Sequence, residues 1–134
     1  MEKKNILITG SSQGIGLVVA KYLCKENNVY ITGRYSEKLE KLCIENDFSG
    51  FCAVDLYEKN SAEKLINTLG VNFDVLINDA GVYFYSPLEK MNNAEIEKSI
   101  MLNTVAPVML SKAVLPYMKE KKWGRIINIG SISG

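Results

Sequence analysis

The stretch that decides the fold is Thr9-Gly10-Ser11-Ser12-Gln13-Gly14-Ile15-Gly16, which directly follows the short apolar run Asn5-Ile6-Leu7-Ile8. Gly10 permits a tight turn, Gly14 lets the backbone come close to a ligand, and Gly16 lets a helix pack closely on a strand. Unpaired N–H groups at the start of a helix favour an anion. Because the glycines lie between a predicted strand and a predicted helix, the stretch predicts a turn that holds the pyrophosphate of a dinucleotide.

Short apolar runs alternate with amphipathic stretches along the rest of the chain. The predicted strands are residues 5–8, 29–32, 51–54, 73–77 and 125–129. The first helix is predicted to end at Asn27-Asn28, and its apolar residues recur at helical spacing at Ile15, Val18, Val19, Tyr22 and Leu23.

Polar residues mark the starts of the later helices. Ser36 is placed to cap the second helix, and the pairs Asn60 with Glu63 and Asn92 with Glu95 fit capping boxes. A longer helix is predicted from about residue 104 to residue 121, with one proline in its first turn, where proline is tolerated. A second proline lies deeper and is expected to kink this helix. The two are Pro107 and Pro116.

The order of elements is βαβαβαβαβ, and the strands are continuous apolar runs rather than alternating ones. This pattern predicts an α/β fold with a parallel sheet that helices cover on both faces. Right-handed crossovers with one reversal give a doubly wound sheet of Rossmann type, with strand order 3-2-1-4-5. Residues 1–134 are expected to form one domain.

Composition excludes several classes of partner. A net charge of +1 gives no basic face for nucleic acid. No apolar run approaches membrane-spanning length, so we expect a cytoplasmic protein without a membrane partner. The chain has no histidine, and Cys24, Cys43 and Cys52 lack metal-ligand spacing. We expect no metal site, and we interpret the cysteines as small apolar fillers in a reducing compartment.

The spacing Thr-Gly-x-x-x-Gly-x-Gly resembles the short-chain dehydrogenase/reductase family, in the branch whose signature is TGxxxGIG. Asp55-Leu56 resembles the pair that contacts the adenine, and Asn78-Asp79-Ala80-Gly81 resembles the family's Asn-Asn-Ala-Gly, with aspartate at the second position. Asn78 is interpreted either as a brace of the sheet or as part of the ribose wall. The candidate cofactor residues are therefore Gly10, Ser12, Gln13, Gly14, Ile15, Gly16, Arg34, Asp55, Leu56, Asn78, Ala80 and Gly81.

The residues after the second strand indicate which dinucleotide binds. Enzymes that prefer NAD(H) place a carboxylate there to hold the ribose hydroxyls, whereas this chain has Gly33-Arg34. A guanidinium suits the 2′-phosphate of NADP(H), which a carboxylate would repel. We therefore favour NADP(H) over NAD(H), although Gln13 stands where some NADP-using relatives carry a basic residue.

The resemblance implies reversible hydride transfer between a nicotinamide and a carbonyl or alcohol substrate, in a homo-oligomer. Asn103 matches the family's catalytic asparagine. Ile127–Gly134 resembles the strand that delivers the catalytic serine, here Ser131. We expect this chain to lack the family's Tyr-x-x-x-Lys element and its C-terminal strands and helices, including the helix that pairs subunits. The fifth strand is then an uncovered edge prone to self-association.

One literal Tyr-x-x-x-Lys match lies upstream, at Tyr117-Met118-Lys119-Glu120-Lys121. Tyr117 continues the apolar stripe of Leu110, Ala113 and Val114, so we interpret it as a core residue. The leading hypothesis is an NADP(H)-dependent oxidoreductase. The alternative is a catalytically incomplete module that binds NADP(H) or a partner, and a sugar-nucleotide epimerase fits the glycine spacing less well. Tyr83, Phe84 and Tyr85 could line a pocket or pack.

Overall fold

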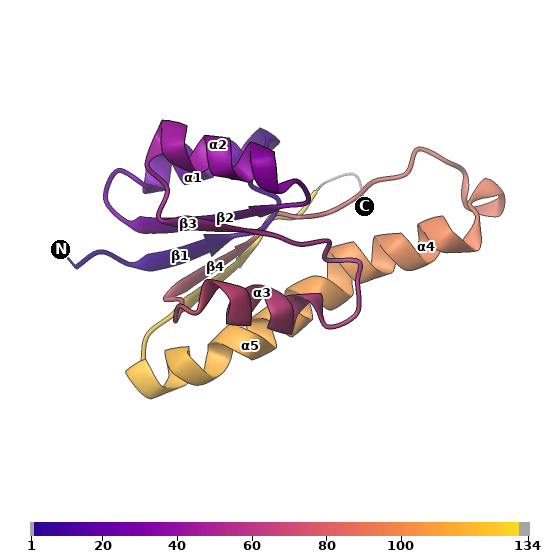
Figure 1. The fold of residues 1–134 in the computed structure, drawn as a ribbon. Coiled ribbons are helices and arrows are strands. Elements are labelled where there is room, and N and C mark those ends of the chain that lie inside the picture. The colour runs from indigo at the N-terminus through magenta and orange to yellow at the C-terminus, as the bar shows by residue number, and fades with distance from the viewer. Residues whose placement is uncertain (1, 132–134) are drawn as a thin grey trace.

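A computed structural model describes residues 2–131 of the chain. Five parallel strands form one sheet in the order β3-β2-β1-β4-β5, as the sequence predicts (Figure 1). Each strand is short, and its residues are predominantly apolar, which suits a sheet covered on both faces. The strands are β1 (Asn5–Ile8), β2 (Asn28–Gly33), β3 (Gly50–Ala53), β4 (Val75–Asn78) and β5 (Arg125–Asn128).

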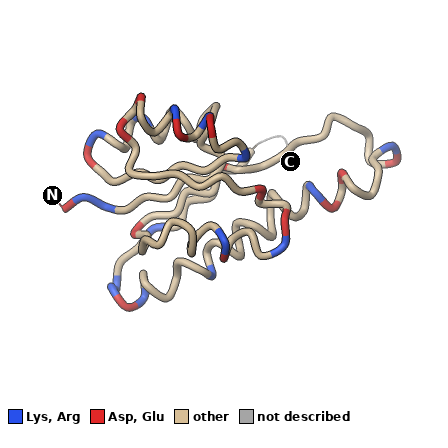
Figure 2. Tube along the Cα trace, viewed as in Figure 1, with Lys and Arg blue, Asp and Glu red and all other residues tan. Residues whose placement is uncertain are grey.

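Helices cover both faces of the sheet. Figure 1 shows α1 (Gly14–Leu23) and α2 (Ser36–Asn46) on one face, and α3 (Ser61–Leu69) and α5 (Ala106–Lys121) on the other. Successive side chains of a strand point to opposite faces, so β1 contributes to two separate cores. Ile6 and Ile8 lie in the core under α1 and α2, whereas Leu7 lies in the core under α3 and α5. Figure 2 shows that charged residues lie mainly on helices and loops.

The helix before β5 is longer than the sheet. It begins as α4 (Asn93–Ile100), continues through one π-helical turn, η2 (Met101–Val105), and becomes α5. The Asn92–Glu95 capping box is present, which confirms the predicted helix start. Between β4 and α4 lies an extended loop with a short 3-10 helix, η1 (Leu88–Lys90).

The helical run Asn93–Lys121 is long and apolar enough to cross a membrane, by length and composition alone. The expectation that no stretch approaches that length was therefore wrong. Its α5 part nevertheless packs on the sheet and on α3, because every fourth residue points into the core. These residues are Ala106, Leu110, Val114 and Met118.

Two helix starts differ from the predictions. Ser36 is the first helical residue of α2 rather than its cap, and the N-cap residue Tyr35 makes no side-chain capping bond. Asn60 is the N-cap of α3, but its φ of 61° is left-handed and its side chain makes no capping bond. The predicted capping box of Asn60 with Glu63 is therefore wrong. Several strand ends also differ from the predicted ones by about one or two residues.

The face that α1 turns to the sheet also differs from the prediction. Ile15, Val18 and Tyr22 are 63%, 68% and 72% exposed, whereas Gly16 and Ala20 are buried. Small residues let this helix approach the sheet closely, and Leu17, Val19 and Leu23 pack beside them against the core. The predicted stripe was therefore right at Val19 and Leu23 and wrong at the three exposed residues, because periodicity weighs a large apolar residue above a small buried one.

Candidate functional site

A cavity of about 470 Å³ opens at the carboxyl ends of the strands, between the chain segments that follow β1, β2, β3 and β4. In doubly wound sheets ligands bind at this edge, where the strand order reverses. All the candidate cofactor residues except Gly16 and Asn78 line this cavity. The fold thus brings together residues that are up to about seventy positions apart in sequence, from Gly10 to Gly81.

The glycines of the first turn divide into two kinds. A Cβ atom at Gly10 would lie 2.7 Å from the Cα of Ala80, and one at Gly16 would lie 2.7 Å from Oδ2 of Asp79, so both allow close packing. Gly14 has a φ of +58°, and a Cβ there would meet nothing within 4 Å. The backbone at Gly14 therefore faces open cavity, and this opening fits a ligand group that approaches the chain directly.

Two buried hydroxyls hold this turn against the sheet. The Thr9 hydroxyl accepts the backbone N–H groups of Asp79 at 3.1 Å and Ala80 at 3.0 Å. The Ser11 hydroxyl donates to the carbonyl of Ile8 and accepts the N–H of Thr32. Neither hydroxyl was predicted to have a role, because the burial of each depends on how the loops assemble.

The start of α1 carries one acidic neighbour. Its N-cap residue, Gln13, makes no side-chain capping bond. The Asp79 carboxylate lies at this helix start and accepts the backbone N–H of Gly16. Burial raises the pKa of Asp79 above its usual value, and the bond from Gly16 offsets this only in part. An aspartate here thus places a titratable charge beside the turn expected to hold an anion.

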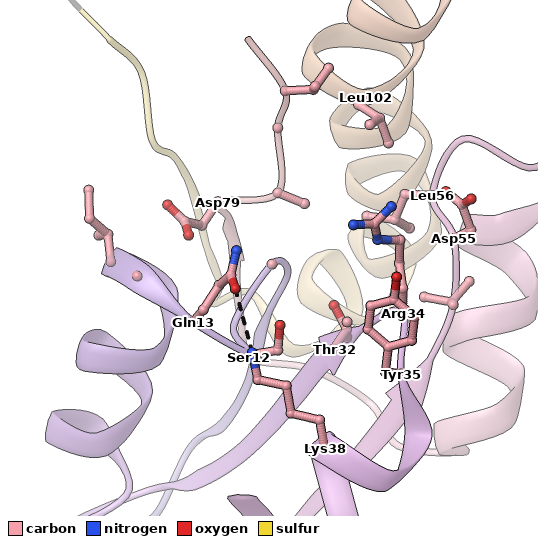
Figure 3. A pocket seen from close by; sticks show the side chains of 18 of the residues that line it. Ser12, Gln13, Thr32, Arg34, Tyr35, Lys38, Asp55, Leu56, Asp79 and Leu102 are labelled. Atoms are coloured by element: carbon pink, nitrogen blue, oxygen red, sulfur yellow. Dashed lines mark hydrogen bonds between the residues drawn. The ribbon is translucent and has the colours of Figure 1, made fainter.

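Cations lie at the β2 end of the cavity (Figure 3). Arg34 follows β2 directly, and its guanidinium lies 5.5 Å from the ring centre of Tyr35. The ammonium of Lys38, from the first turn of α2, lies 3.5 Å from Oε1 of Gln13. Lys38 was not among the residues predicted from the sequence, because a lysine in a charged helix resembles any solvated cation.

The part of the cavity beside the end of β3 contains the predicted pair. Leu56 is buried, and Asp55 accepts the backbone N–H of Tyr57 at 3.0 Å, which fixes its carboxylate in a turn. Two further lining residues come from the helical run, Lys98 in α4 and Leu102 in η2. Neither residue was predicted from the sequence to line a site.

The structure places Asn78 in the sheet. Its amide nitrogen donates to Oδ1 of Asn128 at 2.9 Å, joining β4 to β5, and the residue does not line the cavity. Of the two interpretations left open for Asn78, this arrangement matches the brace. Its Oδ1 is buried and has no hydrogen-bond partner among the described residues.

The two predicted catalytic residues lie near the carboxyl edge but not in the cavity lining. Asn103 sits in η2, where its side chain donates to the Val82 carbonyl and accepts the Val82 N–H, at 2.8 and 2.9 Å. It therefore holds the loop after β4. Ser131 is exposed and follows β5, and Ile132, Ser133 and Gly134 lie outside the described residues.

The upstream tyrosine–lysine match lies at the opposite, amino end of the sheet. The Lys121 ammonium lies 2.7 Å from Oδ1 of Asp74 and 3.3 Å from the Tyr117 hydroxyl. Both bonds raise the pKa of Lys121. The expected stripe through Ala113 was wrong, since Ala113 is exposed and Tyr117 only half-buried. This pair therefore supports the sheet and does not face the cavity.

The aromatic residues after β4 do not line the cavity. Tyr83 and Tyr85 contact each other edge to face at 4.8 Å, and their side chains are 61% and 96% exposed. Of the two uses considered from the sequence, lining a pocket or packing, the contact between these two tyrosines matches packing, at an exposed site outside the cavity.

The family model for short chain dehydrogenases matches residues 4–134. The chain is 36% identical to a 3-ketodihydrosphingosine reductase of Bacteroides thetaiotaomicron, over 100% of this chain and 49% of that protein. It is 32% identical to the NADP-dependent 3-hydroxy acid dehydrogenase YdfG of Escherichia coli, over 96% and 54%. A metagenomic short-chain oxidoreductase crystallised with NADP superposes with a TM-score of 0.85 at 34% identity, over 97% and 63%. The chain spans about half the length of the curated relatives it matches.

Proposed function

The chain belongs to the short-chain dehydrogenase family, and we propose that it acts as an NADP(H)-dependent oxidoreductase on a small carbonyl or alcohol substrate. The nicotinamide, when bound, supplies or accepts the hydride. The residues of this chain bind and orient the dinucleotide at the carboxyl edge of the sheet.

The observation that carries the proposal is the open cavity at Gly14. Gly14 lines it with a left-handed φ, and a Cβ there would meet only empty space. The adjacent start of α1 presents backbone N–H groups and the positive end of the helix dipole. A pyrophosphate at this point would take those donors, and Gly10 and Gly16 keep the turn close enough to the sheet for that approach.

The residues after β2 favour NADP(H). Gly33 lets Ser12 and Leu39 pack closely on the strand end. Arg34 follows it, where a carboxylate would hold the ribose of NAD(H). None of the described carboxylates lies within 4.0 Å of the Arg34 guanidinium, so its charge is available to a phosphate. The NADP-bound and NADP-dependent relatives support the same choice.

Asn103 and Ser131 are the proposed catalytic pair. The Asn103 side chain, held on the loop after β4, would position a water in the proton relay, and the Ser131 hydroxyl would bind the substrate oxygen. Asp55 and Leu56 would contact the adenine, and Ala80 and Gly81 the ribose. The Tyr117–Lys121 pair has no part in the proposal, because it lies at the other end of the sheet.

The experiment is a titration of the purified chain with NADPH and with NADH, followed by nicotinamide fluorescence. We expect NADPH to bind more tightly, and Arg34→Ala to remove the preference. Absence of binding to either dinucleotide would overturn the proposal. Oxidation of NADPH with a panel of aldehydes and ketones then separates an oxidoreductase from a module that only binds.

We also propose that the chain associates with copies of itself. α4 and α5 leave a line of apolar side chains exposed, at Ile100, Val108 and Leu115, which are 55%, 61% and 41% exposed. In the sheet, β5 is the last strand, and its Ile127 is 44% exposed. Exposed apolar surface of this kind favours association.

A cytoplasmic location without a membrane partner belongs to the same proposal. The free thiols of Cys24, Cys43 and Cys52 support it, because such thiols persist in reducing compartments.

A further inference from the structure

We propose that Lys38 determines the preference for NADP(H) together with Arg34, by placing its ammonium on the opposite side of the adenosine 2′-phosphate. This inference rests on the proposed function, because it concerns a phosphate that only NADP(H) carries. It assigns to the first turn of α2 a role in choosing the dinucleotide.

Lys38 lies where it can share a ligand with Arg34. Lys38 lines the same cavity as Arg34, Thr32 and Gly33. Its ammonium reaches across to the glycine turn and lies 3.5 Å from Oε1 of Gln13. In the view of Figure 3, Gln13 and Lys38 lie on one side of the cavity and Arg34 on the other, with Thr32 between them. The cavity thus has a cation on each side of the end of β2.

The second step is charge. The ammonium of Lys38 bonds to a neutral amide, whereas Lys4, Lys41 and Lys121 each pair with a carboxylate. Among residues 2–131 no carboxylate oxygen lies within 4.0 Å of the Lys38 ammonium. Lys38 therefore keeps its full charge for a ligand. A bond to Gln13 orients the lysine without neutralising it.

The third step is chemistry. A phosphate monoester carries close to two negative charges and three strong acceptor oxygens. A guanidinium binds such a group through a planar fork, and an ammonium binds it as a compact point charge. Arg34 and Lys38 acting together neutralise both charges, whereas Arg34 alone neutralises one. NADH has a hydroxyl at this position and gains little from either cation.

The test compares Lys38→Gln with the unchanged chain in titrations with NADPH, NADH, 2′,5′-ADP and 5′-AMP. We expect the dissociation constants of NADPH and 2′,5′-ADP to rise about tenfold, as for loss of one charge-assisted hydrogen bond. Those of NADH and 5′-AMP should stay within about twofold, because they carry no 2′-phosphate. Equal losses for NADPH and NADH would show that Lys38 only holds the turn, and would overturn the inference.

Two further variants sharpen the result. Lys41→Gln removes a lysine of the same helix that pairs with Glu45 instead of facing the cavity, and it should leave both dinucleotide affinities unchanged. Gln13→Lys in the Lys38→Gln chain returns a cation to the point that Lys38 reaches. It should restore most of the NADPH affinity, and a failure to restore it would contradict the placement.

Failure of this inference is distinguishable from failure of the proposed function. If the chain binds NADPH more tightly than NADH and Lys38→Gln has the same ratio of the two affinities, the proposed function stands and the inference about Lys38 is wrong. If the chain binds no dinucleotide, or prefers NADH, both the NADP(H) assignment and the inference about Lys38 are wrong.

Discussion

The Nζ atom of Lys121 lies 2.7 Å from Oδ1 of Asp74, at the end of the sheet opposite the cavity. The other carboxylate oxygen of Asp74 accepts the backbone N–H of Asn5 at 2.9 Å. One buried side chain therefore joins the start of β1 to the end of α5. Burial by itself raises the pKa of Asp74, but the Lys121 ammonium and the Asn5 N–H outweigh it and leave the pKa below its usual value.

Asp74→Asn should remove part of the pH dependence of stability. A carboxyl group whose pKa falls on folding stabilises the protein above its unfolded pKa, and this contribution is lost as the pH falls through its folded pKa. We expect the unfolding free energy of the unchanged chain to drop on acidification below about pH 4. The variant should be less stable at neutral pH and drop less. Urea unfolding at a series of pH values measures both, and parallel curves would contradict the assignment.

Gly14→Ala should abolish tight binding of NADPH while leaving the chain folded. The added methyl group projects into the cavity where the pyrophosphate is proposed to lie, and the left-handed φ costs about 1 kcal/mol of stability for a residue with a Cβ. Gly70→Ala is the matched control, since Gly70 has a φ of +61° and lies outside the cavity. Thermal melting should show similar losses for the two, and fluorescence titration should separate them. Equal NADPH affinity of the two variants would contradict the proposed pyrophosphate position at Gly14.

Asp79→Asn should strengthen the binding of NADPH and flatten its dependence on pH. The pKa of Asp79 is raised, so the carboxyl group is protonated at higher pH than usual. As the pH rises, its charge appears beside the position proposed for the pyrophosphate. Affinity should therefore fall with rising pH in the unchanged chain and remain level in the variant, whose amide oxygen still accepts the Gly16 N–H. The affinities of the two chains should therefore diverge as Asp79 ionises.

The same pKa shift has a consequence for folding. A carboxyl group with a raised pKa contributes most stability below its unfolded pKa, and this contribution is lost as the pH rises through its folded pKa. Asp79→Asn should therefore stabilise the chain at neutral pH. Asp47→Asn, the same chemical change at an exposed site outside the cavity, serves as the control in both measurements. If the two variants shift affinity and stability alike, the effect does not arise at the cavity.

Val108→Glu should weaken self-association. Val108 lies in the middle of the exposed line that also contains Ile100 and Leu115, and a carboxylate there would have to be desolvated in any apolar contact. Light scattering over a range of concentrations should show a smaller apparent mass for the variant, while circular dichroism remains the same. If the unchanged chain is itself monomeric, the proposed self-association is wrong.

Much of the fold was predictable from the sequence because a parallel sheet buried on both faces needs continuous apolar runs. Residues 5–8 and 125–129, for example, predict central and terminal strands that the structure confirms in order, with β5 ending at Asn128. Helix details were less predictable. Asn60 has the composition of a capping residue, but its left-handed backbone turns the side chain away from the cap. Local sequence does not determine that conformation.

The candidate site divides in the same way. Gly10, Gly14 and Arg34 were predicted to share one site, and all three line the cavity; their residue types had indicated close backbone approach and a phosphate ligand. Lys98 and Leu102 were not, since they join the cavity only through the placement of a helical run distant in sequence. Lys38 was not, because a lysine in a charged helix resembles any solvated cation. Asn78 shows the reverse case, because its residue type fits two roles and only the bond to Asn128 distinguishes them.

The π-helical turn η2 joins α4 to α5, so the number of residues in η2 sets how α4 is rotated relative to α5. An α-helix advances about 100° per residue, so an insertion or deletion of one residue before Ala106 would rotate α4 by that angle against α5. Lys98, Leu102 and Asn103 would all swing away from the loop after β4, while Leu110 stayed in the core. Single-residue indels at η2 should thus be tolerated by the fold and yet disable the site. Among relatives of this chain, we expect gaps to be scarce at η2 and frequent around η1.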